Sequence, residues 1–256
     1  MSLNFRQKEI LATVRHSGRV VVEELAETLA VTPQTIRRDL NHLCHEGHLR
    51  RVHGGAVLQS GVANTAYAAR KGINRAAKAA IGRLCAAQIP DDASLFINIG
   101  TTTEAVASAL HGHRNLMVIT NNLNVANILA ANPACDVVVT GGMLRRSDGG
   151  LMGETTLDTV QQFKADYAII GVSAIDMDGS LLDFDFREVR VAKAIIANAR
   201  RVFLVADAGK IGRLAPVRIG HMRDIDAIFT DQPLPEPLAR ICADEAVTLH
   251  VSDTGK

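Results

Sequence analysis

The apolar positions near the N-terminus repeat at the spacing of short helices. Residues 10–14 carry a first apolar face, and residues 23–30 carry a second one behind an acidic N-terminal turn. Residues 48–55 alternate between apolar and polar side chains like a strand, and this segment closes on a glycine turn. Short helices followed by such a strand predict a winged helix-turn-helix domain over residues 1–56.

A further helix is predicted to begin at Thr32-Pro33. Threonine is a good N-cap, and proline suits the first position of a helix. Gly47 is a natural end for this helix. Its predicted apolar stripe has helical spacing and consists of Ile36, Leu40 and Leu43.

From residue 73 onward, short apolar runs alternate with helical patterns. Continuous apolar runs are typical of strands buried on both faces of a parallel sheet with helices on each side. Residues 57–72 are small, polar and weakly patterned, which predicts a linker. The predicted fold class is therefore α/β, with the N-terminal domain followed by a larger parallel-sheet domain over residues 73–256. The runs predicted as strands are 95–99, 116–120, 137–140, 167–171, 202–206, 227–230 and 247–251.

Charge changes the picture only locally. The whole chain carries a formal net charge of +1, which does not by itself indicate a nucleic-acid ligand. Residues 35–56, however, concentrate four arginines in and after the predicted third helix. Glutamine and asparagine pair with adenine in the major groove, and arginine pairs with guanine. The alternative is a solvated helix face. The residues predicted to contact DNA are Thr32, Gln34, Thr35, Arg37, Arg38 and Asn41 on the helix, and Arg50, Arg51 and His53 on the wing.

A second candidate site follows the apolar run at 95–99. Gly100, Thr101, Thr102 and Thr103 read as a glycine turn that leads into a hydroxyl-rich helix start, and such a start binds anions through backbone N–H groups. The alternative is an ordinary structural N-cap. Ligands of parallel sheets bind at the carboxyl ends of the strands, and Lys210 follows another strand at an equivalent place. Lys210 is a candidate phosphate ligand or, alternatively, a surface lysine.

Several classes of protein are disfavoured. The four cysteines lie far apart without metal-ligand or redox spacing, which predicts a reduced, cytoplasmic protein without a metal. The charged N-terminal segment lacks the apolar run of a signal peptide. The uncharged stretch 115–135 contains six asparagines and a proline, so no membrane span is expected. A dinucleotide-binding oxidoreductase is disfavoured because no GxGxxG follows any predicted strand, and no cofactor is expected.

Three strings in the N-terminal domain resemble the signature of the DeoR family of bacterial transcriptional repressors. They are Thr-Ile-Arg-Arg-Asp-Leu at 35–40, Leu-x-x-x-Gly at 43–47 and Leu-Arg-Arg-Val-His-Gly-Gly-Ala at 49–56. The resemblance continues with Thr-Asn-Asn-Leu-Asn-Val-Ala-Asn at 120–127 and Phe-Asp-Phe-Arg-Glu-Val-Arg at 184–190. These later segments are most similar to the subgroup of the family that responds to glycerol 3-phosphate.

The resemblance implies a C-terminal domain with the fold of sugar-phosphate isomerases and a phosphorylated sugar or polyol as effector. It implies that the phosphate is held by Gly100–Thr103 and Lys210. The candidates for the polyol end are Asn121, Gly142, Asp183, Asp185 and Glu188, of which the three acids equally fit an acidic helix start. One departure concerns effector affinity: Asn98 stands where the family usually carries aspartate. A second is Ala208-Gly209 before Lys210, where a serine is common.

The expected function is repression of an operator by a homo-oligomer that a sugar phosphate, expected to be glycerol 3-phosphate, releases from DNA. A sugar-phosphate isomerase-like enzyme is the rival, and the acids near 183–188 nominally supply its acid and base. Against it stands the N-terminal DNA-binding domain, for which an isomerase has no use, so no enzymatic activity is expected. An activator of the same family, responding to a different sugar phosphate, stays open because promoter geometry decides between repression and activation.

Overall fold

The computed structural model of the chain describes residues 3–17, 19–52, 54–58 and 67–252. The chain divides into two compact units, Met1–Thr65 and Ala66–Lys256, called here the N-terminal unit and the C-terminal unit. The predicted boundaries at 56 and 72 differ from this division. β3 (Gly55–Leu58) extends into the predicted linker, and α4 (Tyr67–Gly72) forms a helix at its end. Six residues are too few to show a helical period, which is why the pattern predicted no helix there.

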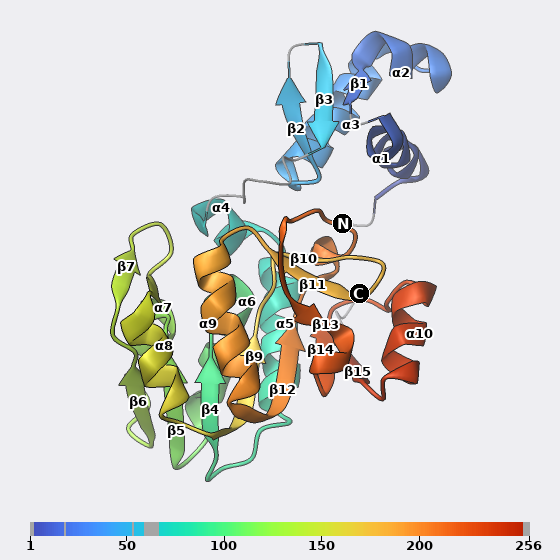
Figure 1. Cartoon of the computed structure of the whole chain (residues 1–256). Helices are drawn as coiled ribbons and strands as arrows, with labels where there is room; N and C mark the ends of the chain where they lie inside the picture. Colours follow the sequence, from blue (N-terminus) through green and yellow to red (C-terminus); the bar gives the residue numbers. More distant parts are fainter. Residues whose placement is uncertain (1–2, 18, 53, 59–66, 253–256) are drawn as a thin grey trace. The chain divides into compact units, whose positions relative to one another are not determined.

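The N-terminal unit contains three helices and a three-stranded antiparallel sheet of order β1-β3-β2 (Figure 1). Gly55 is required in this sheet, because a Cβ atom there would lie 1.9 Å from the backbone oxygen of Val20. Ile10 and Val14 pack with Ile36 and Leu40 in a single core. The elements besides β3 are α1 (Phe5–Ser17), β1 (Arg19–Val21), α2 (Val22–Thr28), α3 (Pro33–His45) and β2 (Leu49–Val52).

The predicted start of the third helix is confirmed. Thr32 is the N-cap of α3, its hydroxyl accepts a hydrogen bond from the backbone N–H of Thr35 at 3.3 Å, and Pro33 is the first helical residue. Ile36, Leu40 and Leu43 are all fully buried. The stripe therefore fixes which face of α3 turns outward.

In the C-terminal unit, the seven predicted runs are confirmed as the strands of one parallel sheet of order β15-β14-β12-β9-β4-β5-β6. Their bounds are β4 (Ser94–Ile97), β5 (Leu116–Thr120), β6 (Cys135–Val139), β9 (Ala165–Ile170), β12 (Ala199–Val205), β14 (Ala227–Thr230) and β15 (Thr248–Val251). The helices are α5 (Arg75–Ala86), α6 (Thr101–Ala109), α7 (Leu123–Leu129), α8 (Glu154–Gln161), α9 (Phe186–Ala197) and α10 (Glu236–Asp244).

Two apolar layers enclose this sheet (Figure 1). α5, α6 and α7 contribute Ile81, Val106 and Val125 to one layer, which also contains Leu95 of β4. α8, α9 and α10 contribute to the other, in which Phe96 of the same strand is buried. Because side chains alternate along a strand, continuous burial on both faces explains the unbroken apolar runs.

Smaller elements lie beyond the carboxyl ends of the parallel strands, and the apolar pattern did not predict them as strands. β7 (Met143–Arg145) and β8 (Gly150–Met152) form an antiparallel hairpin. β10 (Ala174–Ile175), β11 (Ser180–Asp183) and β13 (Val217–His221) form a second antiparallel sheet. A 3-10 turn at Ala208–Lys210 follows β12, and two others lie at Leu110–Gly112 and Met222–Asp224.

Candidate functional site

The outward face of α3 carries most of the residues predicted to contact DNA. Gln34, Arg37, Arg38 and Asn41 are exposed, whereas Thr35 is half-buried. Arg37 forms a 3.4 Å ion pair with Glu23 of α2, with both side chains about half exposed. An exposed pair of this kind contributes little stability, so Arg37 remains available to another anion.

Asp39 points inward from the same helix, which sequence reasoning missed. Its carboxylate accepts a hydrogen bond from Arg6 and another from the side-chain amide of Gln7 at 3.2 Å. Asp39 is only 4% exposed, and both partners come from α1. Asp39 therefore fixes the position of the recognition helix against α1.

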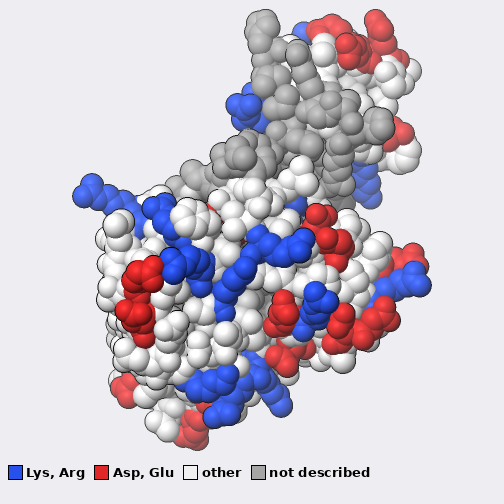
Figure 2. Space-filling model, viewed as in Figure 1, with Lys and Arg blue, Asp and Glu red and all other residues white. Residues whose placement is uncertain are grey.

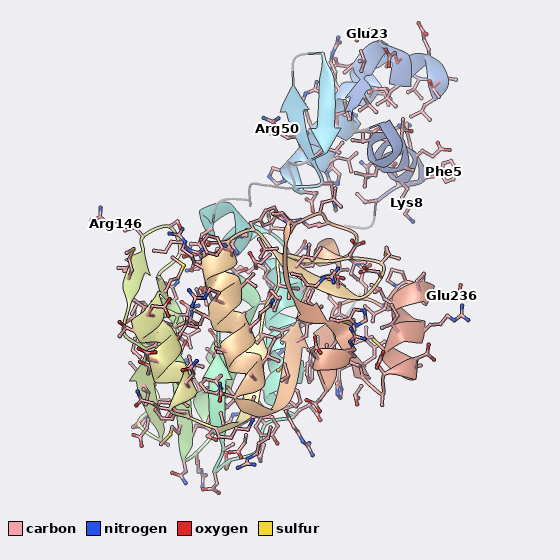
Figure 3. All side chains as sticks on the ribbon, viewed as in Figure 1. Phe5, Lys8, Glu23, Arg50, Arg146 and Glu236 are labelled. Carbon is pink, nitrogen blue, oxygen red and sulfur yellow. The ribbon has the colours of Figure 1, made fainter. Side chains whose placement is uncertain are left out.

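The wing presents the other predicted DNA contacts. Arg50 and Arg51 of β2 are exposed, and Arg50 extends away from its strand (Figure 3). The Arg51 guanidinium donates to the backbone oxygen of Gly55 at 3.1 Å, which links β2 to β3. His53 lies outside the described residues.

In the C-terminal unit, the glycine-threonine turn after β4 is held by its own hydrogen bonds. The fully buried Thr103 hydroxyl lies 2.8 Å from the backbone oxygens of both Asn98 and Gly100, to which it donates. Asn98 accepts a hydrogen bond from the backbone N–H of Gly171 through its side-chain oxygen at 3.0 Å. A carboxylate would accept the same bond, so the asparagine at 98 keeps the turn intact. The Thr103 hydroxyl has a structural role, while the N–H groups of the first turn of α6 have no partner within the helix.

Four positive side chains lie close enough to influence one another near the end of β12, and three of them also feel the charge of Asp207. They form the cation cluster of Arg70, Lys78, Lys210 and Arg213. Asp207 is the acid whose charge raises the pKa of Lys78, Lys210 and Arg213. Burial is the largest cause, and together with the charges of the other three cations it outweighs Asp207, so that the pKa of Lys210 is lowered to about 8.

Two nitrogen atoms of this cluster are buried without a hydrogen-bond partner in the described part of the chain, Arg70 Nε and Arg213 Nη2. A buried N–H group without a partner costs roughly 1–3 kcal/mol. Asp207 is already engaged, since it accepts from the Asn74 side chain at 2.8 Å and from the N–H of Gly209 at 3.1 Å. An excess of positive charge with unpaired donors is suited to an anion.

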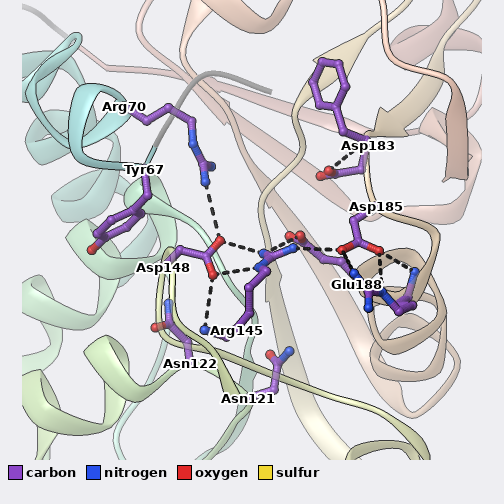
Figure 4. Close-up of polar contacts among 12 residues, drawn as sticks. Tyr67, Arg70, Asn121, Asn122, Arg145, Asp148, Asp183, Asp185 and Glu188 are labelled. Atoms are coloured by element: carbon purple, nitrogen blue, oxygen red, sulfur yellow. Dashed lines mark hydrogen bonds and ion pairs between the residues drawn. The ribbon is translucent and has the colours of Figure 1, made fainter. Parts of the chain in front are cut away.

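Three carboxylates surround one guanidinium in a network next to Arg70 (Figure 4). Arg145, at the end of β7, donates to both oxygens of Asp148 at 2.8 and 2.6 Å, to Glu188 at 2.7 Å and to Asp185 at 3.3 Å. This Arg145 network joins the β7–β8 hairpin to the start of α9. Burial and the charge of Asp183 raise the pKa of Glu188 to about 7, although Arg145 opposes the shift.

Of the remaining residues predicted to bind the effector, some have a structural role and others keep polar atoms available to a ligand. Gly142 has a φ of +124°, and a Cβ atom there would meet Thr156 Oγ1 at 2.2 Å, so packing alone requires glycine. Asp183 is buried and accepts from the backbone N–H of Phe184 at 2.6 Å. Asn121 donates to the backbone oxygen of Leu151, but its side-chain oxygen is buried without a partner among the described residues.

Sequence reasoning missed Arg70, Lys78, Arg145, Asp148 and Arg213. The four basic residues stand in no recognisable motif, and Asp148 stands in an Asp-Gly-Gly string at 148–150 that contributes to the family resemblance without indicating a role for its carboxylate. Arg70 lies in the predicted linker, and Lys78 reads as a polar residue within a helical pattern. Only Arg213, three residues after Lys210, carried a signal, namely its closeness to a predicted cationic site.

A groove of about 1040 Å³ runs along α5, α6 and α7, and its lining reaches from Lys71 and Thr101 to Ala86 and His113. Of the candidate phosphate ligands, only Lys78 and Thr101 line it, so this groove follows the helix faces and is not enclosed by the cation cluster. On the face shown in Figure 2, Lys and Arg side chains lie interspersed with Asp and Glu.

The described residues contain no group of three or more His, Cys, Asp or Glu side chains placed to hold a metal ion. Among the helices of the described segments, none combines the length and the apolar composition that crossing a membrane requires.

Comparison with known proteins gives matches over nearly the whole chain. Residues 6–62 match the DeoR-like helix-turn-helix domain, and residues 73–232 match the DeoR C terminal sensor domain. The chain is 47% identical over 246 residues to the glycerol-3-phosphate regulon repressor of Escherichia coli (strain K12), covering 96% of this chain and 98% of that protein.

Solved structures resemble the C-terminal unit only weakly. eIF2B delta from Chaetomium thermophilum has a TM-score of 0.48 and 17% identity, covering 63% of this chain and 57% of that one. Ribose 5-phosphate isomerase from Plasmodium falciparum has a TM-score of 0.39 and 10% identity, covering 52% of each chain. Likenesses of this size carry no argument about function. The two domain matches and the full-length relative are decisive instead: this chain belongs to the DeoR family.

Proposed function

We propose that this protein is a transcriptional repressor that binds operator DNA through α3 and the wing, and that a sugar phosphate, glycerol 3-phosphate, releases it. The relative with 47% identity is a glycerol-3-phosphate regulon repressor, which supports both the repressor function and glycerol 3-phosphate as the ligand. The observation that carries the effector proposal is the cation cluster, with its unpaired buried donors beside a parallel sheet's carboxyl edge.

The phosphate end of the ligand is assigned to the cation cluster and the N-terminal turn of α6. The four cations repel one another there, and Asp207 is the one acid that acts on Lys78, Lys210 and Arg213 alike, so a phosphate dianion would offset their mutual repulsion. The backbone N–H groups of Thr101 and Thr102 add donors at the positive end of the helix dipole. Lys210 then acts as a point charge, and the arginines supply directed hydrogen bonds.

The hydroxyl end of the ligand is assigned to the acids around Arg145, to Asp183 and to the side-chain amide of Asn121. Asp183, Asp185 and Glu188 supply acceptors for hydroxyl protons, and the unpartnered oxygen of Asn121 supplies another. Gly142 remains a candidate only through its backbone. A short polyol fits this arrangement because its hydroxyls and its phosphate point to opposite ends.

Release from DNA requires that the effector bind the DNA-incompetent state more tightly, because equal affinity for both states shifts no population. We place the protein on DNA as a homo-oligomer, so that two recognition helices match repeated half-sites. The ligand would then favour an arrangement in which the helices no longer match this spacing.

One observation favours a second candidate, an isomerase-like enzyme. The pKa of Glu188 is raised to about 7 and that of Lys210 is lowered to about 8, which suits acid-base chemistry near neutral pH. Glu188, however, is tied to Arg145 at 2.7 Å. Isomerisation of ribose 5-phosphate by the purified protein would support the enzyme, and its absence together with DNA binding supports the repressor.

Glycerol 3-phosphate should release the wild-type protein from an operator selected from random duplexes, and glycerol should not. Replacing Lys210 by alanine should raise the half-release concentration about 10- to 100-fold, because a charged partner of the phosphate is lost. Fluorescence anisotropy of labelled DNA measures both. Lys193→Ala, which removes an exposed lysine on α9, is the matched control.

The release assay should also depend on pH. As the pH rises through about 8, Lys210 loses its proton and its attraction for phosphate, so the half-release concentration should increase. Lys210→Arg keeps its charge and should abolish this increase. If Lys210→Ala has the same half-release concentration of glycerol 3-phosphate as the wild-type protein, Lys210 does not bind the phosphate.

Replacing Arg38 by alanine should weaken operator binding by about 1–3 kcal/mol and relax sequence choice at one base pair. The reason is that Arg38 is exposed on α3, with its charge free to reach a base edge. Lys8→Ala, an exposed cation on α1, should leave binding unchanged (Figure 3). If Arg38→Ala weakens binding to all duplexes equally, Arg38 contacts a phosphate and not a base.

A further inference from the structure

α4 is the first described helix of the C-terminal unit. The polar contacts described between α4 and the rest of this unit are made with residues of the candidate effector site. The Tyr67 hydroxyl lies 3.0 and 2.9 Å from the two carboxylate oxygens of Glu104, to which it donates. Lys78 Nζ donates to the backbone oxygen of Arg70 at 2.5 Å. The Arg70 guanidinium forms an ion pair with Asp148 at 3.6 Å (Figure 4).

The ion pair of Arg70 is the weakest of these tethers. Arg145 approaches the same oxygen of Asp148 at 2.6 Å and binds the other oxygen as well. Asp148 is thus already satisfied without Arg70. Arg70 Nε has no hydrogen-bond partner among the described residues, although the side chain is only 15% exposed. A largely buried guanidinium with a long ion pair and an unpaired N–H group can donate further hydrogen bonds to an anion.

Arg70 also belongs to the group of cations at the phosphate end. Burial and the charge of Asp207 have the largest effects on the pKa of Lys78. The charge of Arg70 comes next and lowers this pKa. Its charge likewise lowers the pKa of Lys210 and of Arg213. Without an anion, these charges repel one another, and that repulsion opposes the docking of α4. A phosphate dianion among them would replace repulsion by attraction.

We propose that Arg70 is a ligand of the effector's phosphate, and that effector binding fastens α4 onto the carboxyl edge of the sheet. This inference rests on the proposed function, because it takes a sugar phosphate as the occupant. α4 follows residues 59–66, the segment that joins the two units in the sequence. The helix next to the connection would then register whether the sensor site is filled.

Calorimetry on the full-length protein tests the ligand role. Arg70→Ala should weaken binding of glycerol 3-phosphate about 10- to 100-fold. Arg70→Lys keeps the charge but loses the planar fork, so it should lose only part of that affinity. Lys193→Ala, which removes an exposed lysine on α9, is the control and should bind like wild type. The thermal midpoint without ligand should not fall in Arg70→Ala, because the substitution relieves repulsion.

Hydrogen exchange measured by mass spectrometry tests the fastening of α4. Adding glycerol 3-phosphate should slow exchange of the backbone amides of residues 67–72 in wild type and in Lys193→Ala, but not in Arg70→Ala. Wild-type affinity in Arg70→Ala, or unchanged exchange in wild type on binding, overturns the role of α4 and leaves the proposed function standing. Absence of binding by the wild-type protein overturns both.

Discussion

Replacing Arg145 by alanine is expected to lower the free energy of unfolding of the C-terminal unit by about 3–5 kcal/mol. Asp148 is 4% exposed, and Asp185 and Glu188 keep one-fifth or less of their side chains exposed. Removing the guanidinium leaves these acids without their shared counter-charge. The hairpin β7–β8 would also lose its link to α9.

Tyrosine fluorescence during urea unfolding measures this effect in the C-terminal unit alone. The chain has no tryptophan, and both of its tyrosines, Tyr67 and Tyr167, lie in that unit. Arg146→Ala is the matched control, because Arg146 is exposed and extends away from the hairpin (Figure 3). A midpoint that is unchanged in Arg145→Ala would show that the Arg145 network contributes no net stability.

Replacing Asp39 by alanine is expected to destabilise the N-terminal unit by about 2 kcal/mol and to weaken operator binding as a consequence. The substitution leaves the buried Gln7 amide without its acceptor and Arg6 without its partner. Since one-third of the Arg6 side chain is exposed, water compensates part of that loss. α3 would then lose its polar attachment to α1.

Two optical signals separate this effect from a change elsewhere. Asp39→Ala should lower the midpoint of a circular dichroism transition without moving the tyrosine transition, because no tyrosine lies in the N-terminal unit. Arg38→Ala should lose DNA affinity without moving either midpoint. If Asp39→Ala retains both stability and affinity, the polar contacts to α1 do not position α3.

The start of α3 shows what local sequence determines. Thr32 and Pro33 satisfy and shape the first turn by themselves, so the cap was predicted from adjacent residues and the structure confirmed it. The apolar stripe at Ile36, Leu40 and Leu43 then decides which residues of the helix face outward. The strands of the parallel sheet were likewise predicted from runs of a few residues, because burial on both faces leaves an unbroken apolar signal.

The strand order and the effector site show where local signals end. β9 lies between β4 and β12 because of packing across the whole sheet, and no short pattern encodes that order. The predicted linker over 57–72 contains the end of β3 and the helix α4, which the pattern did not predict, for a related reason. α4 is too short for a period of its own, and its described side-chain tethers are contacts with Glu104, Lys78 and Asp148.

The sequence by itself determined the domain types, the capped third helix with its outward arginines, and the glycine-threonine turn at the sheet edge. Each of these depends on side chains within one or two turns of one another. Only the tertiary structure decided that Asp39 faces α1, that Arg145 binds Glu188 from 43 residues away, and that Arg70 pairs with Asp148. The physical reason is that a buried charge is stabilised by partners that the fold brings close in space, and these partners can lie at any distance along the sequence.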